Sequence, residues 1–167
     1  NMLKPYIQIS EAFRRKQDTL HFIKKAEKDT LAVYKYPEGT LVDLNEADTT
    51  ELKKIPGIGS GIARMIVAYR KRLGGFYDMA QLKEVNYVDE DMLRWFKLGN
   101  APIHRINANK AGLDKLRSHP YMNFYQAKVI IEYRRKKGKL KSLSQLSLYE
   151  EFTEKDLERL SHYLAFD

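Results

Sequence analysis

A glycine-bearing turn between two short helical patterns constrains the fold of this chain more than any other feature. The segment from residue 52 to residue 67 reads LKKIPGIGSGIARMIV, with apolar residues at helical spacing on both sides of the turn. Pro56 and Gly57 are typical of a helix end, and Gly59 follows two positions later. Glycine adopts positive φ angles and lets another backbone approach closely. The sequence therefore predicts two helices joined by a tight turn, the second over about residues 60–73.

The start of the second helix is a candidate phosphate site. A helix leaves its first amide N–H groups unpaired, and the helix dipole adds positive potential at that end. The main chain around the turn can therefore donate to phosphate oxygens. The candidate residues form one segment, Gly57, Ile58, Gly59, Ser60 and Gly61. The alternative is that these glycines only shape a tight turn between two helices.

Basic side chains flank this turn. Lys53 and Lys54 precede it, and Arg64 follows it on the second helix. Each is a candidate for contact with a phosphate group, and simple solvation is the alternative for each. We expect Arg64 to make such a contact, because it places a cation beside the turn.

The chain repeats itself at a shift of 64 residues, and such a repeat predicts a duplicated helical module. The matching residues are Pro56 and Pro120, Ala63 and Ala127, Tyr69-Arg70 and Tyr133-Arg134, Gly74 and Gly138, and Gln81-Leu82 and Gln145-Leu146. Upstream, Leu44-Asn45 matches Ile106-Asn107 at a shift of 62, which predicts two extra residues in the second copy. We expect one module over 41–100 and a second over 101–167.

Capping patterns predict where the shorter helices begin. Capping-box spacing occurs at Asp48 and Glu51, at Asp78 and Gln81, and at Ser142 and Gln145, while Asp89 and Thr153 are further candidate N-caps. The turns before Asp89 and Thr153 contain no glycine. We expect these two turns to keep their packing role and to lose phosphate binding.

The first copy resembles the ComEA-like competence proteins, which carry the helix-hairpin-helix motif. The resemblance rests on VDLNEAD at 42–48, IPGIG at 55–59, Tyr69-Arg70, Gly75-Phe76 and Gln81-Leu82. It covers about 41–98 closely and about 104–164 in weaker form. It implies an all-α fold of two tandem helix-hairpin-helix modules, which are SAM-domain-like bundles. An N-terminal helical arm or linker over 1–40 would precede them.

The same resemblance implies a function and a location. ComEA-like proteins are DNA receptors in natural transformation, and they pass double-stranded DNA to a membrane translocation channel. They are periplasmic or anchored on the outer side of the cytoplasmic membrane, and we expect this chain to be cut from a longer protein. The family also implies that main-chain carbonyls of the Ile55–Gly59 hairpin can hold a monovalent cation. No other cofactor is expected.

The second copy departs from the family pattern at its hairpin. Tyr121 and Asn123 stand where the first copy has Gly57 and Gly59. Tyrosine adopts positive φ poorly, and its ring would crowd an approaching phosphate. We therefore expect this hairpin to pack rather than to bind phosphate. Lys128 takes the position of Arg64, and the sequence favours neither contact nor solvation for it.

Basic residues are concentrated in the second copy. The net charge of the chain is +8, divided as +3, 0 and +5 over 1–40, 41–100 and 101–167. The densest run contains Arg134, Arg135, Lys136 and Lys137. Such a run is either a helix end that complements the dipole or an electrostatic surface for duplex backbone.

Several function classes find no support in the sequence. There is no cysteine, which excludes disulfides and cysteine-based zinc sites. The histidines lack metal-ligand spacing, and no nucleophile–base set or phosphate-binding loop of a nucleotide enzyme occurs. No apolar run approaches the roughly 20 residues that cross a bilayer. We expect no metal site and no enzymatic activity.

The sequence therefore predicts a protein that binds double-stranded DNA through backbone phosphates, without sequence readout and without catalysis. The resemblance makes a receptor in DNA uptake the first expectation for its role. Two alternatives stay open: a DNA-targeting module of a repair or recombination enzyme, and a protein-interaction scaffold that has lost DNA binding.

Overall fold

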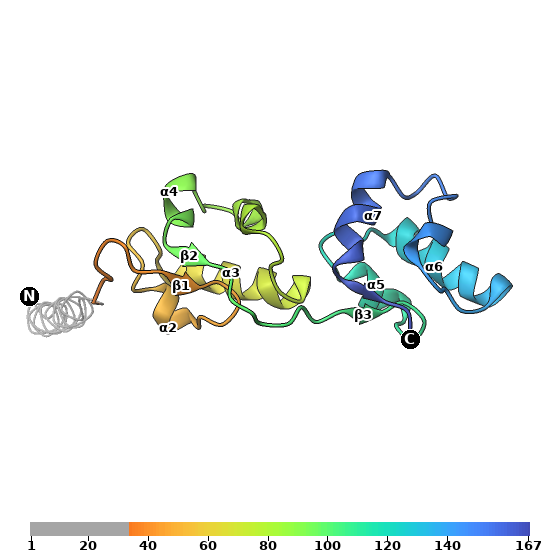
Figure 1. The fold of residues 1–167 in the computed structure, drawn as a ribbon, viewed down its shortest axis with the longest axis horizontal. Coiled ribbons are helices and arrows are strands. Elements are labelled where there is room, and N and C mark those ends of the chain that lie inside the picture. Colours follow the sequence, from red (N-terminus) through yellow and green to blue (C-terminus); the bar gives the residue numbers. More distant parts are fainter. Residues whose placement is uncertain (1–33) are drawn as a thin grey trace, which may run out of the picture. The chain divides into compact units, whose positions relative to one another are not determined.

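The computed structural model describes residues 34–167, and most of the arm predicted over 1–40 lies outside the described residues (Figure 1). Lys35–Asp167 form one compact unit. In chain order its elements are β1 (Val42–Asp43), α2 (Thr49–Leu52), α3 (Ser60–Leu73), the 3-10 helix η1 (Met79–Glu84), α4 (Glu90–Leu93), β2 (Phe96–Lys97), β3 (Ile106–Asn107), α5 (Leu113–Arg117), α6 (Phe124–Lys137), the 3-10 helix η2 (Leu143–Gln145), α7 (Glu154–Ser161) and β4 (Leu164–Ala165).

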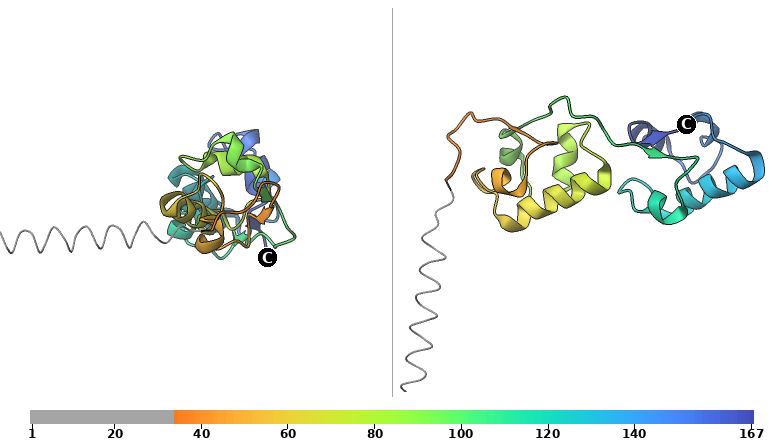
Figure 2. Two further views of the ribbon diagram at one scale, coloured as in Figure 1. Left: turned by 90° about the vertical axis from the view of Figure 1, so that its left-hand side faces the viewer. Right: turned by 90° about the horizontal axis from the view of Figure 1, so that it is seen from below.

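The described chain is mostly helical, which confirms the predicted all-α class. The two longest helices, α3 and α6, have 14 residues each and can be followed in Figure 2. The capping boxes expected at Asp48, Asp78 and Ser142 are present, and Asp89 and Thr153 cap α4 and α7. Gly74 ends α3 in the left-handed conformation, at φ 90°. Local polar contacts therefore set the helix boundaries where the sequence placed them.

Two short strand pairs close the modules, and the sequence did not predict them. Strand β1 pairs in parallel with β2, and β3 pairs in parallel with β4. Each pair joins the beginning of one module to its end. A strand of two residues is too short to show an alternating pattern in a sequence.

The two modules align at a shift of 64 residues from the first strand to the last N-cap, so the predicted two-residue insertion is wrong. Strands β2 and β4 lie at a shift of 68, because α7 is four residues longer than α4. Asp43 and Asn107 each accept the amide N–H two residues later, at 2.8 and 2.9 Å. Asn45 and Asn109 each bond the N–H and the C=O of the residue 31 positions later. The incorrect alignment paired Asn45 with Asn107, because each follows an aliphatic residue.

Each module contains two hairpins with the same main-chain bonding. They begin at Leu52, Leu82, Leu116 and Leu146, and we number them first to fourth. In each, the amide three residues after the leucine donates to the leucine carbonyl, and the next bond is again three residues on, all at 3.1–3.2 Å. All four leucines are fully buried. The hairpins thus share one scaffold and differ in the residues at their tips.

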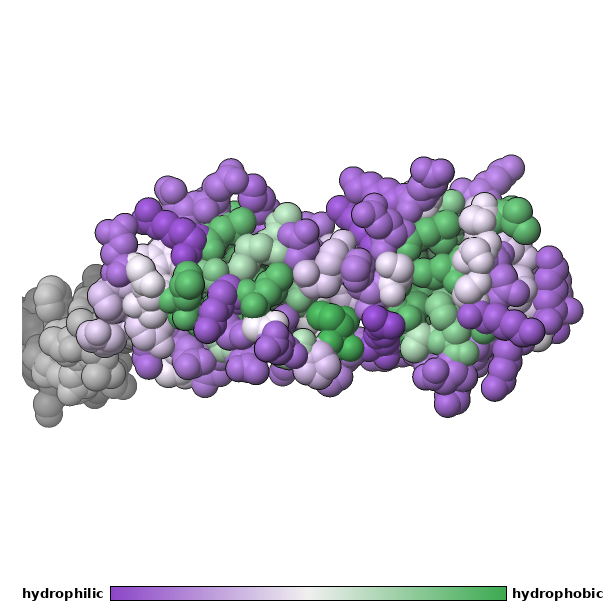
Figure 3. Space-filling model, in the orientation of Figure 1, coloured by the Kyte–Doolittle hydropathy of each residue, from purple (hydrophilic) through white to green (hydrophobic). Residues whose placement is uncertain are grey.

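Each module has its own hydrophobic core. Ile55, Ile66 and Phe76 belong to the first core, and Ile130 and Leu140 belong to the second. The aromatic residues Phe76, Trp95, Phe96 and Tyr133 are buried in these cores, whereas Tyr69 is half-buried and donates its hydroxyl to Glu84. On the face drawn in Figure 3, hydrophilic residues surround apolar patches on both modules.

A buried polar network joins the two modules. Tyr163 follows α7 in the second module, yet it is fully buried in the first core. The side-chain amide of Gln81 donates to the hydroxyls of Tyr163 and Tyr121, at 2.8 and 2.9 Å. These hydroxyls donate onward to Gly75 O and to the Glu84 carboxylate. Burial raises the pKa of Tyr121 to about 12, so its hydroxyl keeps the proton that it donates.

His119 locks the same junction and does so in one tautomer. Its Nε2 lies 3.0 Å from Leu73 O, and a carbonyl can only accept, so Nε2 carries the proton. Its Nδ1 accepts from the Tyr121 amide at 3.2 Å. The ring is 2% exposed, and burial lowers the pKa of His119 from 6.5 to about 4. Protonation of Nδ1 would break the bond to Tyr121.

This geometry predicts a loss of stability in mild acid. Between pH 6.5 and about 4 the unfolded chain binds a proton at His119 and the folded chain does not, so unfolding is favoured as pH falls. The loss approaches roughly 3 kcal/mol at pH 4. Urea unfolding at several pH values should show a steeper decline for the wild type than for His119→Gln. If the free energy of unfolding declined equally in both proteins, His119 would not be the group that lowers stability in acid.

Candidate nucleic-acid interface

The two glycines at the tip of the first hairpin serve different purposes. Gly57 has φ +82°, and a Cβ there would lie 3.1 Å from Met92 Cε. Gly59 has φ −96° and ψ 178°, which is extended backbone open to any residue. Positive φ therefore explains Gly57 but not Gly59. Glycine at position 59 instead leaves the amides at the start of α3 uncovered, because it has no side chain.

Gly59 is the N-cap of α3 and provides no capping side chain. No group in residues 34–167 accepts from the amides of Gly59, Ser60, Gly61 or Ile62. A Cβ added at Gly59 or Gly61 would meet nothing within 4 Å. Gly59, Ser60 and Gly61 are exposed, whereas the Ile58 side chain is fully buried and leaves only its main chain near the tip. The amides at the start of α3 thus face open space with no partner in the described chain.

The other three hairpins cap themselves. At the position of Gly59 they carry Asp89, Asn123 and Thr153. Each of these side chains accepts the amide three residues later, at 2.9 to 3.2 Å. Asn123 and Thr153 also donate their own amides to Gln126 and Asp156, which completes capping boxes. These helix starts therefore have an internal acceptor where the first hairpin has none.

Cations surround the first hairpin. Arg64 is exposed on α3, and its Nε donates to Ser60 O at 3.1 Å, which holds the guanidinium near the tip. Lys53 and Lys54 are half-buried, and Lys54 Nζ lies 5.6 Å from the centre of the Tyr36 ring. An unexpected fourth cation is Lys35, whose Nζ donates to hairpin carbonyls. The amides therefore lie in a basic environment, as an anion site requires.

Sequence reasoning missed Lys35 and the contrast between capped and uncapped hairpins. Lys35 lies 18 to 23 residues before the carbonyls that it contacts, and no local pattern connects positions so far apart. The capping contrast was visible in the sequence, because Asp89, Asn123 and Thr153 are strong N-cap residues and Gly59 is not. To recognise this contrast from the sequence, one would have to know that the four hairpin tips are structurally equivalent.

The third hairpin is occupied by its own side chains. The Tyr121 hydroxyl takes part in the network at the module junction. The Arg159 guanidinium carbon lies 4.7 Å from the centre of the Tyr121 ring. Phe124 and Tyr125 take the positions of Ser60 and Gly61 and place exposed aromatic rings beside the helix start. The packing role expected for Tyr121 agrees with these contacts.

The basic run at the end of α6 is not a uniform surface. Arg134 is half-buried and donates to Ala111 O at 2.6 Å, as Arg70 does to Ala47 O in the first module. The Arg134 guanidinium therefore donates to the main chain of its own module, and its contact with DNA stays a prediction. Arg135 is exposed and has no hydrogen-bond or ion-pair partner in the described chain.

The remaining basic residues of α6 have internal partners on the surface. Lys128 and Lys136 lie 3.8 and 3.6 Å from the Glu132 carboxylate. Lys137 lies over the rings of Tyr133 and Tyr149, at 5.5 and 5.9 Å. Exposed pairs of this kind contribute little to stability and exchange readily for other partners. These lysines can still contact a polyanion.

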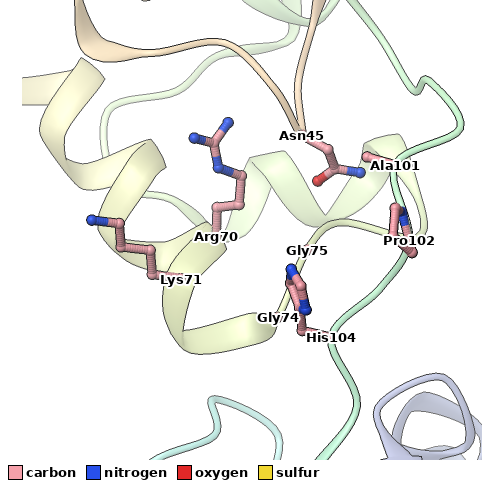
Figure 4. Close-up of a pocket in the computed structure, with 8 residues that line it drawn as sticks. All are labelled: Asn45, Arg70, Lys71, Gly74, Gly75, Ala101, Pro102 and His104. Atoms are coloured by element: carbon pink, nitrogen blue, oxygen red, sulfur yellow. The ribbon is translucent and has the colours of Figure 1, made fainter.

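A hollow at the end of α3 lies apart from the predicted site. It is lined by Asn45, Arg70, Lys71, Gly74, Gly75, Ala101, Pro102 and His104 (Figure 4). The linker between the modules forms one wall, and the His104 amide donates to Gly74 O. None of the residues predicted to bind DNA lines it. The hollow therefore follows from the way the linker leaves the first module.

Within residues 34–167, no three acidic or histidine side chains come together in an arrangement that could hold a metal ion. None of the described helices combines the length and the apolar character that a membrane span needs.

The comparison with protein families agrees with this geometry. The family described as helix-hairpin-helix motif matches residues 38–95 and 102–165, one match for each module. The chain therefore belongs to the helix-hairpin-helix family. Tandem motifs of this kind support DNA binding without sequence specificity in general.

Curated relatives match the chain over a small part of their own length. The endonuclease/exonuclease/phosphatase family domain-containing protein 1 of Mus musculus is 27% identical over 154 residues, covering 72% of this chain and 27% of that protein. The proteins of the same name from Xenopus laevis and Danio rerio are 25% and 28% identical and are covered to 26% and 23%. The chain thus spans about a quarter of these relatives. No solved structure matches it.

The two arginines of the basic run should separate in a stability measurement. Arg134→Gln leaves Ala111 O without its donor, and the expected loss in the free energy of unfolding is about 1–3 kcal/mol. Arg135→Gln removes an exposed side chain, and the expected change is within about 0.5 kcal/mol. Urea unfolding measures both. Equal effects would mean that Arg134 has no structural role.

Proposed function

We propose that this chain binds double-stranded DNA by donating the main-chain amides at the start of α3 to a backbone phosphate. Arg64, Lys53 and Lys54 would add Coulombic attraction around that contact. These contacts involve only the sugar-phosphate backbone, so binding does not depend on the base sequence. Main-chain amides supply neither a nucleophile nor a base, and the proposed role is binding without catalysis.

The observation that carries the proposal is the difference among four equivalent hairpins. All four have the same main-chain bonding, and three of them cap the following helix with a side chain. The first has glycine at that position and leaves its amides open. A capped helix start is more stable, so an uncapped one at an exposed tip is best explained by an external acceptor.

We also propose two biological roles in which this DNA binding could be used. The relatives carry the name of an endonuclease/exonuclease/phosphatase family domain, and the chain spans about a quarter of their length. This favours a role as the DNA-targeting module of a larger protein. The resemblance of residues 42–59 to ComEA-like proteins supports a second role, as a DNA receptor outside the cytoplasmic membrane that delivers DNA to a translocation channel.

Capping the first hairpin with its own side chain should weaken DNA binding without unfolding the protein. Gly59→Asn introduces the residue found at the third hairpin, and the φ of Gly59 accepts it without strain. Its side chain would compete with phosphate for the amides of α3. We expect affinity for a duplex to fall at least about tenfold, which corresponds to the loss of one hydrogen bond to a charged group.

Charge and capping can be separated with a matched pair. Gly59→Asp and Asn123→Asp each add one negative charge at an equivalent N-cap. Only the first should reduce affinity strongly, on two unrelated duplexes alike and with a shallower salt dependence. Fluorescence anisotropy measures all variants. If Gly59→Asn binds as the wild type does, or if both aspartates weaken binding equally, the first hairpin is not the phosphate site.

A further inference from the structure

The ammonium group of Lys35 lies within hydrogen-bond distance of three main-chain carbonyls of the first hairpin. Its Nζ is 2.6 Å from Lys53 O, 3.1 Å from Ile55 O and 3.3 Å from Ile58 O. A lysine ammonium has three donors and no acceptor, so this is a complete set of partners.

These carbonyls need a cation because the turn provides few amide donors for them. No amide in the described chain donates to Lys53 O or Ile58 O, and Ile55 O receives only the Ile58 amide. Three carbonyl dipoles that converge on one point create a local negative potential. Without a positive group there, the carbonyls would repel one another and leave hydrogen-bonding capacity unmet.

The chain around Lys35 is docked against the hairpin by independent contacts. The Tyr36 amide donates to Lys54 O at 2.8 Å, and Lys54 Nζ lies over the Tyr36 ring. A turn follows, in which Thr40 donates its amide and its hydroxyl to Pro37 O. The position of the ammonium is thus set by main-chain bonding as well as by its own three contacts.

The arrangement is confined to the hairpin with open amides. The equivalent carbonyls of the third hairpin belong to Arg117, His119 and Met122, and no lysine of the described chain donates to them. The second and fourth hairpins likewise receive no ammonium among the described residues. The cation therefore accompanies the proposed phosphate site and not the shared hairpin scaffold.

We propose that Lys35 is a built-in cation that holds the first hairpin in its phosphate-binding form and occupies a place that a free monovalent metal ion would otherwise fill. The part that concerns phosphate rests on the proposed function, and the part that concerns the ion does not. An ammonium and a potassium ion are alike in charge and similar in size. The ammonium donates hydrogen bonds to carbonyl oxygens, and potassium is coordinated by them. With Lys35 in place the hairpin has no need of an ion from solution.

The test compares potassium with a cation too large for the hairpin, in the absence of DNA. The melting temperature of the wild type should be the same in potassium chloride and in tetramethylammonium chloride of equal concentration. Lys35→Met should melt about 3–8 °C lower in tetramethylammonium chloride, and potassium should restore part of that loss. Arg135→Gln removes an exposed cation that contacts no hairpin carbonyl and none of the residues around Lys35, and it should show no difference between the salts.

Each other outcome overturns the proposal. A wild type that is itself stabilised by potassium already uses a free ion, and Lys35 does not replace it. A Lys35→Met variant with the same loss in both salts has no place for an ion. If that variant does not fold, Lys35→Gln supplies the comparison, because its amide still donates to a carbonyl while lacking the charge. DNA affinity should then be measured in the two chlorides at equal concentration, and it should differ between them only in the Lys35 variants. If the variants bind DNA as the wild type does and show no difference in melting between the salts, the cation role is refuted and the proposed function stands.

Discussion

The structure depends on how each hairpin satisfies the main-chain polar groups that its tight turn exposes. A turn of this kind leaves amides on the side of the following helix and carbonyls on its inner side. The second, third and fourth hairpins satisfy their amides with Asp89, Asn123 and Thr153. At the first hairpin, Lys35 donates to the carbonyls, and the amides stay open. One scaffold therefore yields three tips with capped amides and one tip with open amides, which is the proposed phosphate site.

The duplication has a structural use beyond a second copy of the motif. The second module inserts Tyr163 into the first core and binds Leu73 O through His119, at the end of the helix whose start is the proposed phosphate site. Gln81 and Glu84 of the first module bind the hydroxyls of Tyr121 and Tyr163 from the second. Helix α3 is thus held at its far end by the second module, so in our proposal the second copy helps to position the phosphate site of the first.

Much of the fold could be predicted from the sequence, because short-range chemistry determines it. The caps at Asp48, Asp78 and Asp89 and the glycine end of α3 follow from residues within a few positions of one another. Contacts between distant residues could not be predicted. The guanidinium of Arg134 bonds Ala111 O, and Lys35 reaches the first hairpin, yet in the sequence both look like ordinary surface charges. The register of the repeat was misjudged for a related reason, since Asn45 and Asn107 look alike until their partners are known.

The open amides at the start of α3 can be followed directly during DNA binding. A titration of the nitrogen-15-labelled chain with a short duplex, observed by two-dimensional NMR, reports each backbone N–H separately. We expect large shifts for Ser60, Gly61 and Ile62, and small shifts at the capped starts of α4, α6 and α7. Large shifts at the start of α6 or α7, with residues 59–62 unmoved, would contradict a phosphate site at the first hairpin.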